Sequence, residues 1–234
     1  MLLALALACG DSTIDGGLST VSSVTDASQY GPVVTQLRSR SMMGSRERTY
    51  KSILEAMPNV VFVGPEGNRG SASDAVLIGS VVDVTPGASF VWDEVGTTRT
   101  ELPFNDEQAM SSTIHVEMKI DQQIAVSPGV VLGPTVSFGL ALGPFVDVEA
   151  AVAELKGLGT ILVFLHEHSP VFDYDKSLLS VLEDGAFLGL VAEDGTVTFP
   201  AMDPVAVPVL VPAGLTVDTL RDAPTNPIEI QING

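Results

Sequence analysis

Residues 114–120 show the clearest regular pattern in the chain: the even-numbered positions are apolar and the odd-numbered ones are polar. A repeat of two places alternate side chains on opposite faces, which is typical of a β-strand with one buried face. Apolar runs at residues 60–63, 74–84, 130–142 and 161–165 predict further strands. We therefore expect the central part of the protein to be a sheet.

Turn-forming residues predict where these strands end. Thr85-Pro86-Gly87 should end the long strand that precedes it, and residues 93–109 should form a long polar loop. Asp184-Gly185 and Asp194-Gly195 separate three short apolar runs in the last quarter of the chain. Asp-Gly favours tight hairpin turns because both residues tolerate positive φ. We predict an antiparallel meander there.

Helical spacing is found on both sides of the first strands. Between Tyr50 and Met57 the apolar residues recur at i, i+3, i+4 and i+7. We predict a helical segment over residues 33–57 that is broken near Gly44 and ends before Pro58. This segment carries five of the eleven basic residues, and we interpret it as a solvated helix face.

A second helix is predicted after Asp147, whose side chain suits an N-cap. Apolar residues from Val148 to Leu155 follow the helical repeat, and Gly157 should stop the helix. Residues 205–234 are rich in proline and should form an extended tail, with a short helix near residues 216–222.

The charge of the chain excludes some partners. It holds 29 acidic and 11 basic residues, which gives a net charge of −18. Nucleic acid requires a basic surface, so we exclude it as a partner. Anionic lipid headgroups are repelled for the same reason. A single cysteine among 234 residues allows no disulfide within the chain, so stability must come from the hydrophobic core.

That cysteine, Cys9, directly follows an apolar N-terminal run and Ala8. The run is too short to span a bilayer, which takes about 20 residues, but it fits the core of a signal peptide. The arrangement resembles the lipobox of bacterial lipoproteins, in which the cysteine carries the lipid. It departs from that pattern at Ala6, where leucine is preferred, and in having no basic residue before Leu2.

The resemblance to lipoproteins implies a domain order. Residues 1–8 would be a signal peptide remnant and residues 9–32 a flexible stalk, lipidated at Cys9 and rich in small polar residues. The helical segment 33–57 would follow, and then a β-domain over residues 58–204 before the tail. The implied location is the cell membrane, with the lipid-anchored protein on its extracytoplasmic face.

The order of strands resembles a group of uncharacterised bacterial secreted proteins with an OB-like, netrin/TIMP-type β-barrel. The segments that carry this resemblance are Ser73–Val81, His115–Met118, Gly159–Leu165, Gly185–Phe187 and Asp194–Val197. They span roughly residues 70–200. The resemblance implies a mainly β fold: an antiparallel OB-like β-barrel with one short packing helix. The eukaryotic members of this fold depend on disulfides, so their activities and functional residues do not transfer to this chain.

Candidate chemistry is concentrated at His166-Glu167-His168. On a strand, His166 and His168 would share one face, and with Asp173 or Asp175 they could supply nitrogen and oxygen ligands to a metal. The alternative is that both histidines lie in the polar loop after strand 161–165. We favour this alternative and expect no metal and no cofactor.

Two hypotheses for the function follow. The first is a non-enzymatic surface lipoprotein that binds a protein or envelope partner, through the loop 93–109 or the basic helical segment. The second is a metal-assisted hydrolase centred on His166 and His168. The sequence favours the first, because no catalytic motif is complete. If His166 and His168 converge with a carboxylate around a cavity, the second hypothesis gains.

Overall fold

The computed structural model describes residues 29–43, 51–93, 98–167, 178–223 and 228–232. Cys9, the rest of the predicted signal segment and the stalk up to residue 28 lie outside the described residues. Within the described part the fold is mainly β, as the sequence predicts. Its buried apolar side chains form one continuous core, to which strands of both sheets and the helices contribute.

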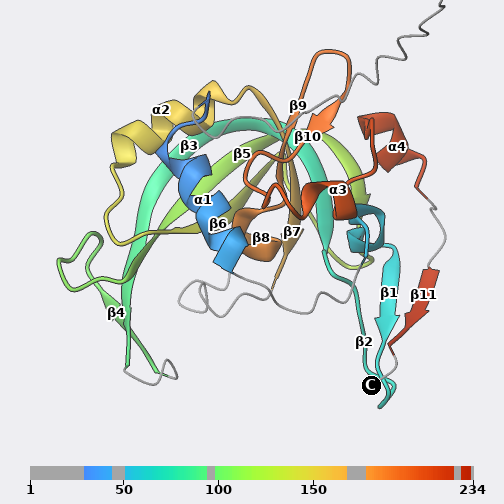
Figure 1. The fold of residues 1–234 in the computed structure, drawn as a ribbon, viewed down its shortest axis with the longest axis horizontal. Coiled ribbons are helices and arrows are strands. Elements are labelled where there is room, and N and C mark those ends of the chain that lie inside the picture. Colours follow the sequence, from blue (N-terminus) through green and yellow to red (C-terminus); the bar gives the residue numbers. More distant parts are fainter. Residues whose placement is uncertain (1–28, 44–50, 94–97, 168–177, 224–227, 233–234) are drawn as a thin grey trace, which may run out of the picture.

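The main sheet has eight strands in the order β10-β9-β7-β8-β6-β5-β3-β4. Their bounds are β3 Ala75–Trp92, β4 Arg99–Leu102, β5 Ser111–Val126, β6 Thr135–Leu142, β7 Thr160–His166, β8 Leu179–Val181, β9 Leu188–Val191 and β10 Val197–Thr198. Figure 1 shows β3 and β5 as long, strongly curved ribbons that run side by side. β5 extends the predicted strand 114–120 at both ends, whereas β3 extends the predicted strand 74–84 only at its C-terminal end.

One further pairing joins β7 to β3. As a result, the five strands β3, β5, β6, β8 and β7 each pair with two others of the set. All of these pairings are antiparallel except that of β6 with β8, which is parallel. The helix α2 (Val148–Gly157) lies in sequence between β6 and β7.

Three elements stand apart from the main sheet and form a second, smaller sheet. β1 (Val60–Val63) pairs with β2 (Arg69–Gly70) and, in parallel, with β11 (Ile228–Gln231). β11 belongs to the segment that we predicted as an extended tail. The register aligns Val60 with Ile228, so the end of the described chain is held beside its first strand.

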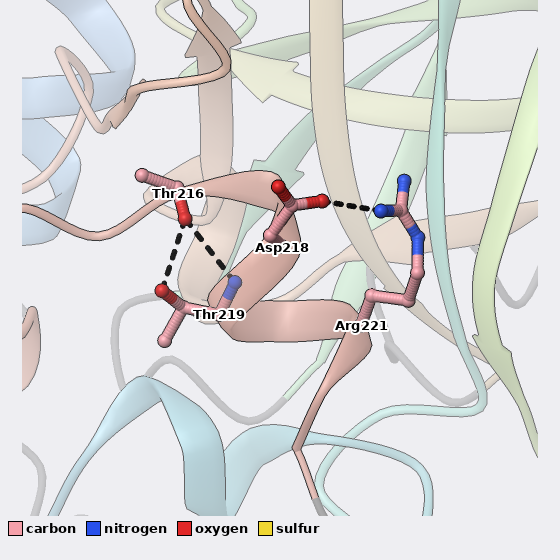
Figure 2. A network of polar contacts seen from close by, with 4 residues as sticks. All are labelled: Thr216, Asp218, Thr219 and Arg221. Carbon is pink, nitrogen blue, oxygen red and sulfur yellow. Dashed lines mark hydrogen bonds and ion pairs between the residues drawn. The ribbon is translucent and has the colours of Figure 1, made fainter.

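Two short helices precede β11: α3 (Val207–Leu210) and α4 (Val217–Arg221). Thr216 caps α4 by accepting a hydrogen bond from the backbone N–H of Thr219 at 3.2 Å. Figure 2 shows this cap together with the ion pair between Asp218 and Arg221 one turn further on. The buried side chains of Val217 and Leu220 fix α4 against the body of the protein.

The predicted helical segment contains two helices, α1 (Pro32–Met43) and the short 3-10 helix η2 (Ile53–Ala56). The residues around Gly44 lie outside the described part. α2 (Val148–Gly157) begins at its predicted cap, where Asp147 accepts from the backbone N–H of Ala150 at 3.0 Å. It ends at Gly157, as predicted, with Leu158 as its C-cap, and Gly159, with a φ of +74°, makes the turn away from it.

Two predicted strand ends are wrong. Thr85-Pro86-Gly87 does not end β3, which continues to Trp92; a register shift between Pro86 and Ser89 absorbs this segment as a bulge. The predicted loop 93–109 contains the edge strand β4, which pairs with the end of β3. A bulge lets the chain accommodate proline within a long strand because the ladder is interrupted there anyway.

The Asp184-Gly185 hairpin is also wrong, whereas Asp194-Gly195 does join β9 to β10. β8 and β9 do not pair with each other: each pairs with β7, at opposite ends of it. Asp184 and Gly185 have φ values of 54° and 99°. Both lie in a short 3-10 turn, η4 (Glu183–Gly185), between β8 and β9. The Asp-Gly pair therefore makes a kink along one edge of β7.

Candidate functional site

A hollow of about 210 Å³ lies on β3, β5 and β6. It is lined by Asp83, Thr85, His115, Val116, Glu117, Ser137 and Leu178. Polar side chains thus form most of its wall, and Leu178, which directly precedes β8, adds an apolar patch. The hollow joins residues that are almost 100 positions apart in the sequence.

Strand register explains why these polar residues meet. On one rung of the sheet Asp83 is opposite Glu117, and Glu117 is opposite Ser137. On a neighbouring rung Thr85 is opposite His115. Opposite residues on adjacent strands project to the same face with their Cβ atoms about 5 Å apart. All five side chains therefore share the outer face, and the residues between them on each strand face the core.

The position of Asp83 depends on an irregularity in β3. The register shifts between Val81 and Asp83, so one extra residue, Val82, is inserted opposite β5. Without that insertion Asp83 would fall on the other face, because a slip of one residue reverses every side chain of a strand. The bulge therefore places this carboxylate opposite Glu117.

His115 is held close to the backbone of β3. A Cβ atom at Gly87 would lie 2.8 Å from its Nε2 and 2.4 Å from Oγ1 of Thr113. Only glycine leaves room for both side chains at this point. Thr113 itself is fully buried and exchanges two hydrogen bonds with the backbone of Ala88, each at 2.9 Å. The bulged part of β3 is thus pinned against β5 directly beside the hollow.

The described residues that line the hollow include the carboxylates of Asp83 and Glu117 and the imidazole of His115, but no lysine or arginine. Asp83 and Glu117 face each other across the strands, an arrangement that destabilises a sheet. The nearest basic residue along β5, Lys119, donates to Asp121 at 2.9 Å instead. The described residues contain no group of three or more His, Cys, Asp or Glu side chains that could hold a metal ion.

His166, a predicted metal ligand, lies at the end of β7 opposite Ser180 of β8. Ser180 is in turn opposite Gly139, and Gly139 is opposite His115. His166 and His115 are therefore on one rung but three strands apart, which is about 14 Å along the sheet. His168, Asp173 and Asp175, the other predicted ligands, lie outside the described residues, as does the lipidation residue Cys9.

The basic segment is partly used to fix α1 to the body. Arg38 donates from Nε to the carbonyl of Pro200 at 2.6 Å, and Ser41 accepts from the backbone N–H of Asp203 at 3.2 Å. At the other end of α1, the Glu154 carboxylate of α2 accepts from the backbone of Val33 and Val34. These contacts favour a structural role for the described part of this segment.

Sequence reasoning did not identify the hollow. The alternating pattern of residues 114–120 places His115 and Glu117 on the polar face of one strand. The pattern gave no indication that β3 would bring Asp83 and Thr85 to the same face, because that pairing depends on the bulge at Val82.

No protein-family model, no curated protein and no solved structure matches the chain. None of the described helices combines the length and the apolar character that are needed to cross a bilayer.

Proposed function

We propose that the protein is an exported, lipid-anchored binding module that has an OB-like barrel and no enzymatic activity, and that the hollow on β3, β5 and β6 receives its partner. Five strands that each pair with two others support the barrel, as do the parallel pairing of β6 with β8 and the helix between β6 and β7. An OB fold is a five-stranded Greek-key barrel.

The position of the hollow is the observation that carries the proposal. Counted within the five strands, β5 and β6 are the second and third, and ligands of OB folds bind on the face of these two strands. The hollow lies on this face, beside Leu178 at the start of the segment that leads into β8. A fold alone does not establish a function, so the support for binding comes from the concave, polar surface itself.

A protein is the partner class that best suits this surface. A net charge of −18 excludes nucleic acid. The hollow, at about 210 Å³, is smaller than the roughly 300–1,000 Å³ of sites that enclose a drug-sized molecule. It has the size to receive one side chain of a larger partner, with the surrounding strands making the rest of the contact.

The test is to block the hollow. Ser137 is exposed and lines the hollow, so Ser137→Trp should fill it without disturbing the core. Thr135→Trp is the matched control, since Thr135 is exposed on the same face of the same strand but outside the hollow. In cell envelopes that contain the full chain, chemical cross-linking should yield a partner band with the wild type and Thr135→Trp. Its persistence with Ser137→Trp would show that the hollow is not the binding site.

The lipid anchor is a separate part of the proposal. The support for it is the position of Cys9, which is the only cysteine, follows an apolar run and precedes a polar stretch. Cys9→Ala should move the protein from the membrane fraction to the soluble fraction, and mass spectrometry should find diacylglycerol on Cys9 of the wild type. Unchanged membrane association of Cys9→Ala would contradict lipidation.

A further inference from the structure

The charges of the hollow indicate what its occupant must offer. Asp83 and Glu117 stand opposite each other on β3 and β5, with Cβ atoms about 5 Å apart. Two carboxylates at that separation can both accept hydrogen bonds from a single cationic group placed between them. Ser137 extends the same rung with a hydroxyl, and Leu178 supplies an apolar wall.

We infer that the hollow receives a lysine or arginine side chain of a protein partner. This inference rests on the proposed function, since it names the group that enters the same hollow. The ammonium or guanidinium group would lie between Asp83 and Glu117, and the aliphatic stem would pack on Leu178. Such a side chain joins an apolar stem to a charged end, and therefore matches a wall that is part apolar and part acidic.

Three properties of the chain support this occupant. Among the described residues, the wall of the hollow contains two facing carboxylates, the imidazole of His115 and no lysine or arginine, so a cation placed between the carboxylates would relieve their mutual repulsion. The hollow has room for one side chain. The excess of acidic residues over the whole chain would steer a basic partner toward it and raise the association rate.

The facing carboxylates also affect the stability of the free protein. If the two carboxylates are retained for binding, neutralising one of them should relieve repulsion in the absence of a partner. Asp83→Asn and Glu117→Gln should therefore melt at a Tm equal to or above that of the wild type. A fall in Tm would show that these side chains stabilise the fold, and would count against the inference.

Binding is tested with a short probe that carries one basic side chain. The full chain, labelled with ¹⁵N, is titrated with acetyl-Gly-Lys-Gly-amide and, as a matched neutral probe, with the same peptide carrying norleucine. The lysine peptide should shift the backbone amides of residues 83–85, 115–117 and 137, and the norleucine peptide should not. Shifts spread over the whole acidic surface, or none at all, would overturn the inference.

Charge variants then identify the contact. Asp83→Asn and Glu117→Gln should each weaken binding of the lysine peptide by at least about fivefold, a typical loss for one charge-assisted hydrogen bond. Glu193→Gln is the control, because it removes the same charge from an exposed turn between β9 and β10. Equal weakening by Glu193→Gln would show that only the net charge matters and would overturn the inference. Tighter binding of cadaverine, a free diamine, than of the lysine peptide would also overturn it.

Failure of the inference can be distinguished from failure of the proposed function. If Ser137→Trp abolishes the cross-link to the partner while Asp83→Asn and Glu117→Gln leave it unchanged, the hollow is a binding site but not for a cation. If Ser137→Trp has no effect on the cross-link, the proposed function fails, and the inference fails with it.

Discussion

The side chain of Asn105 pairs with the backbone of Val146 in both directions. The Val146 N–H donates to Oδ1 at 3.0 Å, and Nδ2 donates to the Val146 carbonyl at 2.8 Å. The backbone N–H of Asn105 donates to Oγ of Ser89, which shares a hydrogen bond with Ser112. Because Ser112 also donates to the carbonyl of Pro144, one network joins the loop before β5 to the segment between β6 and α2.

Replacing Asn105 should loosen this junction. Its φ of 59° lies in the left-handed region, which asparagine and glycine tolerate better than alanine. Asn105→Ala should lower the free energy of unfolding by about 1–3 kcal/mol, because it leaves the backbone polar groups of Val146 without their hydrogen-bond partners and strains the backbone at residue 105. Asn105→Gly removes the same bonds without strain, so it should lose less. Urea unfolding measures both, and an equal loss would show that backbone strain contributes nothing.

A carboxylate of α2 should determine whether α1 stays docked. Glu154 accepts from the N–H groups of Val33 and Val34 at 2.7 and 2.9 Å, and so satisfies two donors at the start of α1. Glu154→Ala should cost about 1 kcal/mol and increase amide hydrogen exchange in α1 specifically. Glu149→Gln removes the same charge from the same helix and should leave exchange in α1 unchanged.

Gly31→Ala tests the same contact from the other side. A Cβ atom at residue 31 would lie 2.4 Å from Oε2 of Glu154, so the carboxylate would have to move away from the α1 backbone. We expect Gly31→Ala to increase amide hydrogen exchange in α1 as Glu154→Ala does. The double variant Gly31→Ala/Glu154→Ala should show no further increase in this exchange. Additive effects in the double variant would mean that Gly31 and Glu154 act separately.

Local patterns predicted those elements that local chemistry determines. The alternation of residues 114–120 identified β5, and the carboxylate of Asp147 identified the start of α2. Asp184-Gly185 shows the limit. Both residues do adopt the positive φ values that the Asp-Gly pair indicates, but the chain uses them for a kink because β8 and β9 both have a non-local partner in β7.

The candidate site was less predictable for the same reason. The outward direction of His115 and Glu117 follows from the alternation along one strand. That Asp83 faces Glu117 depends on the register between two strands and on a bulge at Val82, and neither has a local signature in the sequence.

Asp194 should titrate below its ordinary range. The backbone and side chain of Thr196 donate hydrogen bonds that favour the charged form and hold the pKa of the Asp194 carboxyl below its ordinary value of 3.8. A lowered pKa in the folded state means that the stabilisation is present above pH 3.8 and is lost as the pH falls through the folded pKa. Carboxyl ¹³C NMR should record this pKa, and Thr196→Ala should return it partway. A pKa at or above 3.8 would contradict the turn geometry.

Gly79 should be the least replaceable glycine of β3. It lies between β5 and β7, where a Cβ atom would be 2.0 Å from the carbonyl oxygen of Lys119. That oxygen belongs to the backbone of a paired strand and cannot move aside as a flexible side chain could. Gly79→Ala should therefore destabilise the fold by at least the roughly 1–3 kcal/mol of an overpacked core. Gly133→Ala is the control, since a Cβ atom at residue 133 would lie 3.7 Å from its nearest neighbour, the carbonyl oxygen of Thr135. Its free energy of unfolding should change by less than about 0.5 kcal/mol. Equal midpoints in urea for the two variants would show that β3 and β5 can separate locally at no cost.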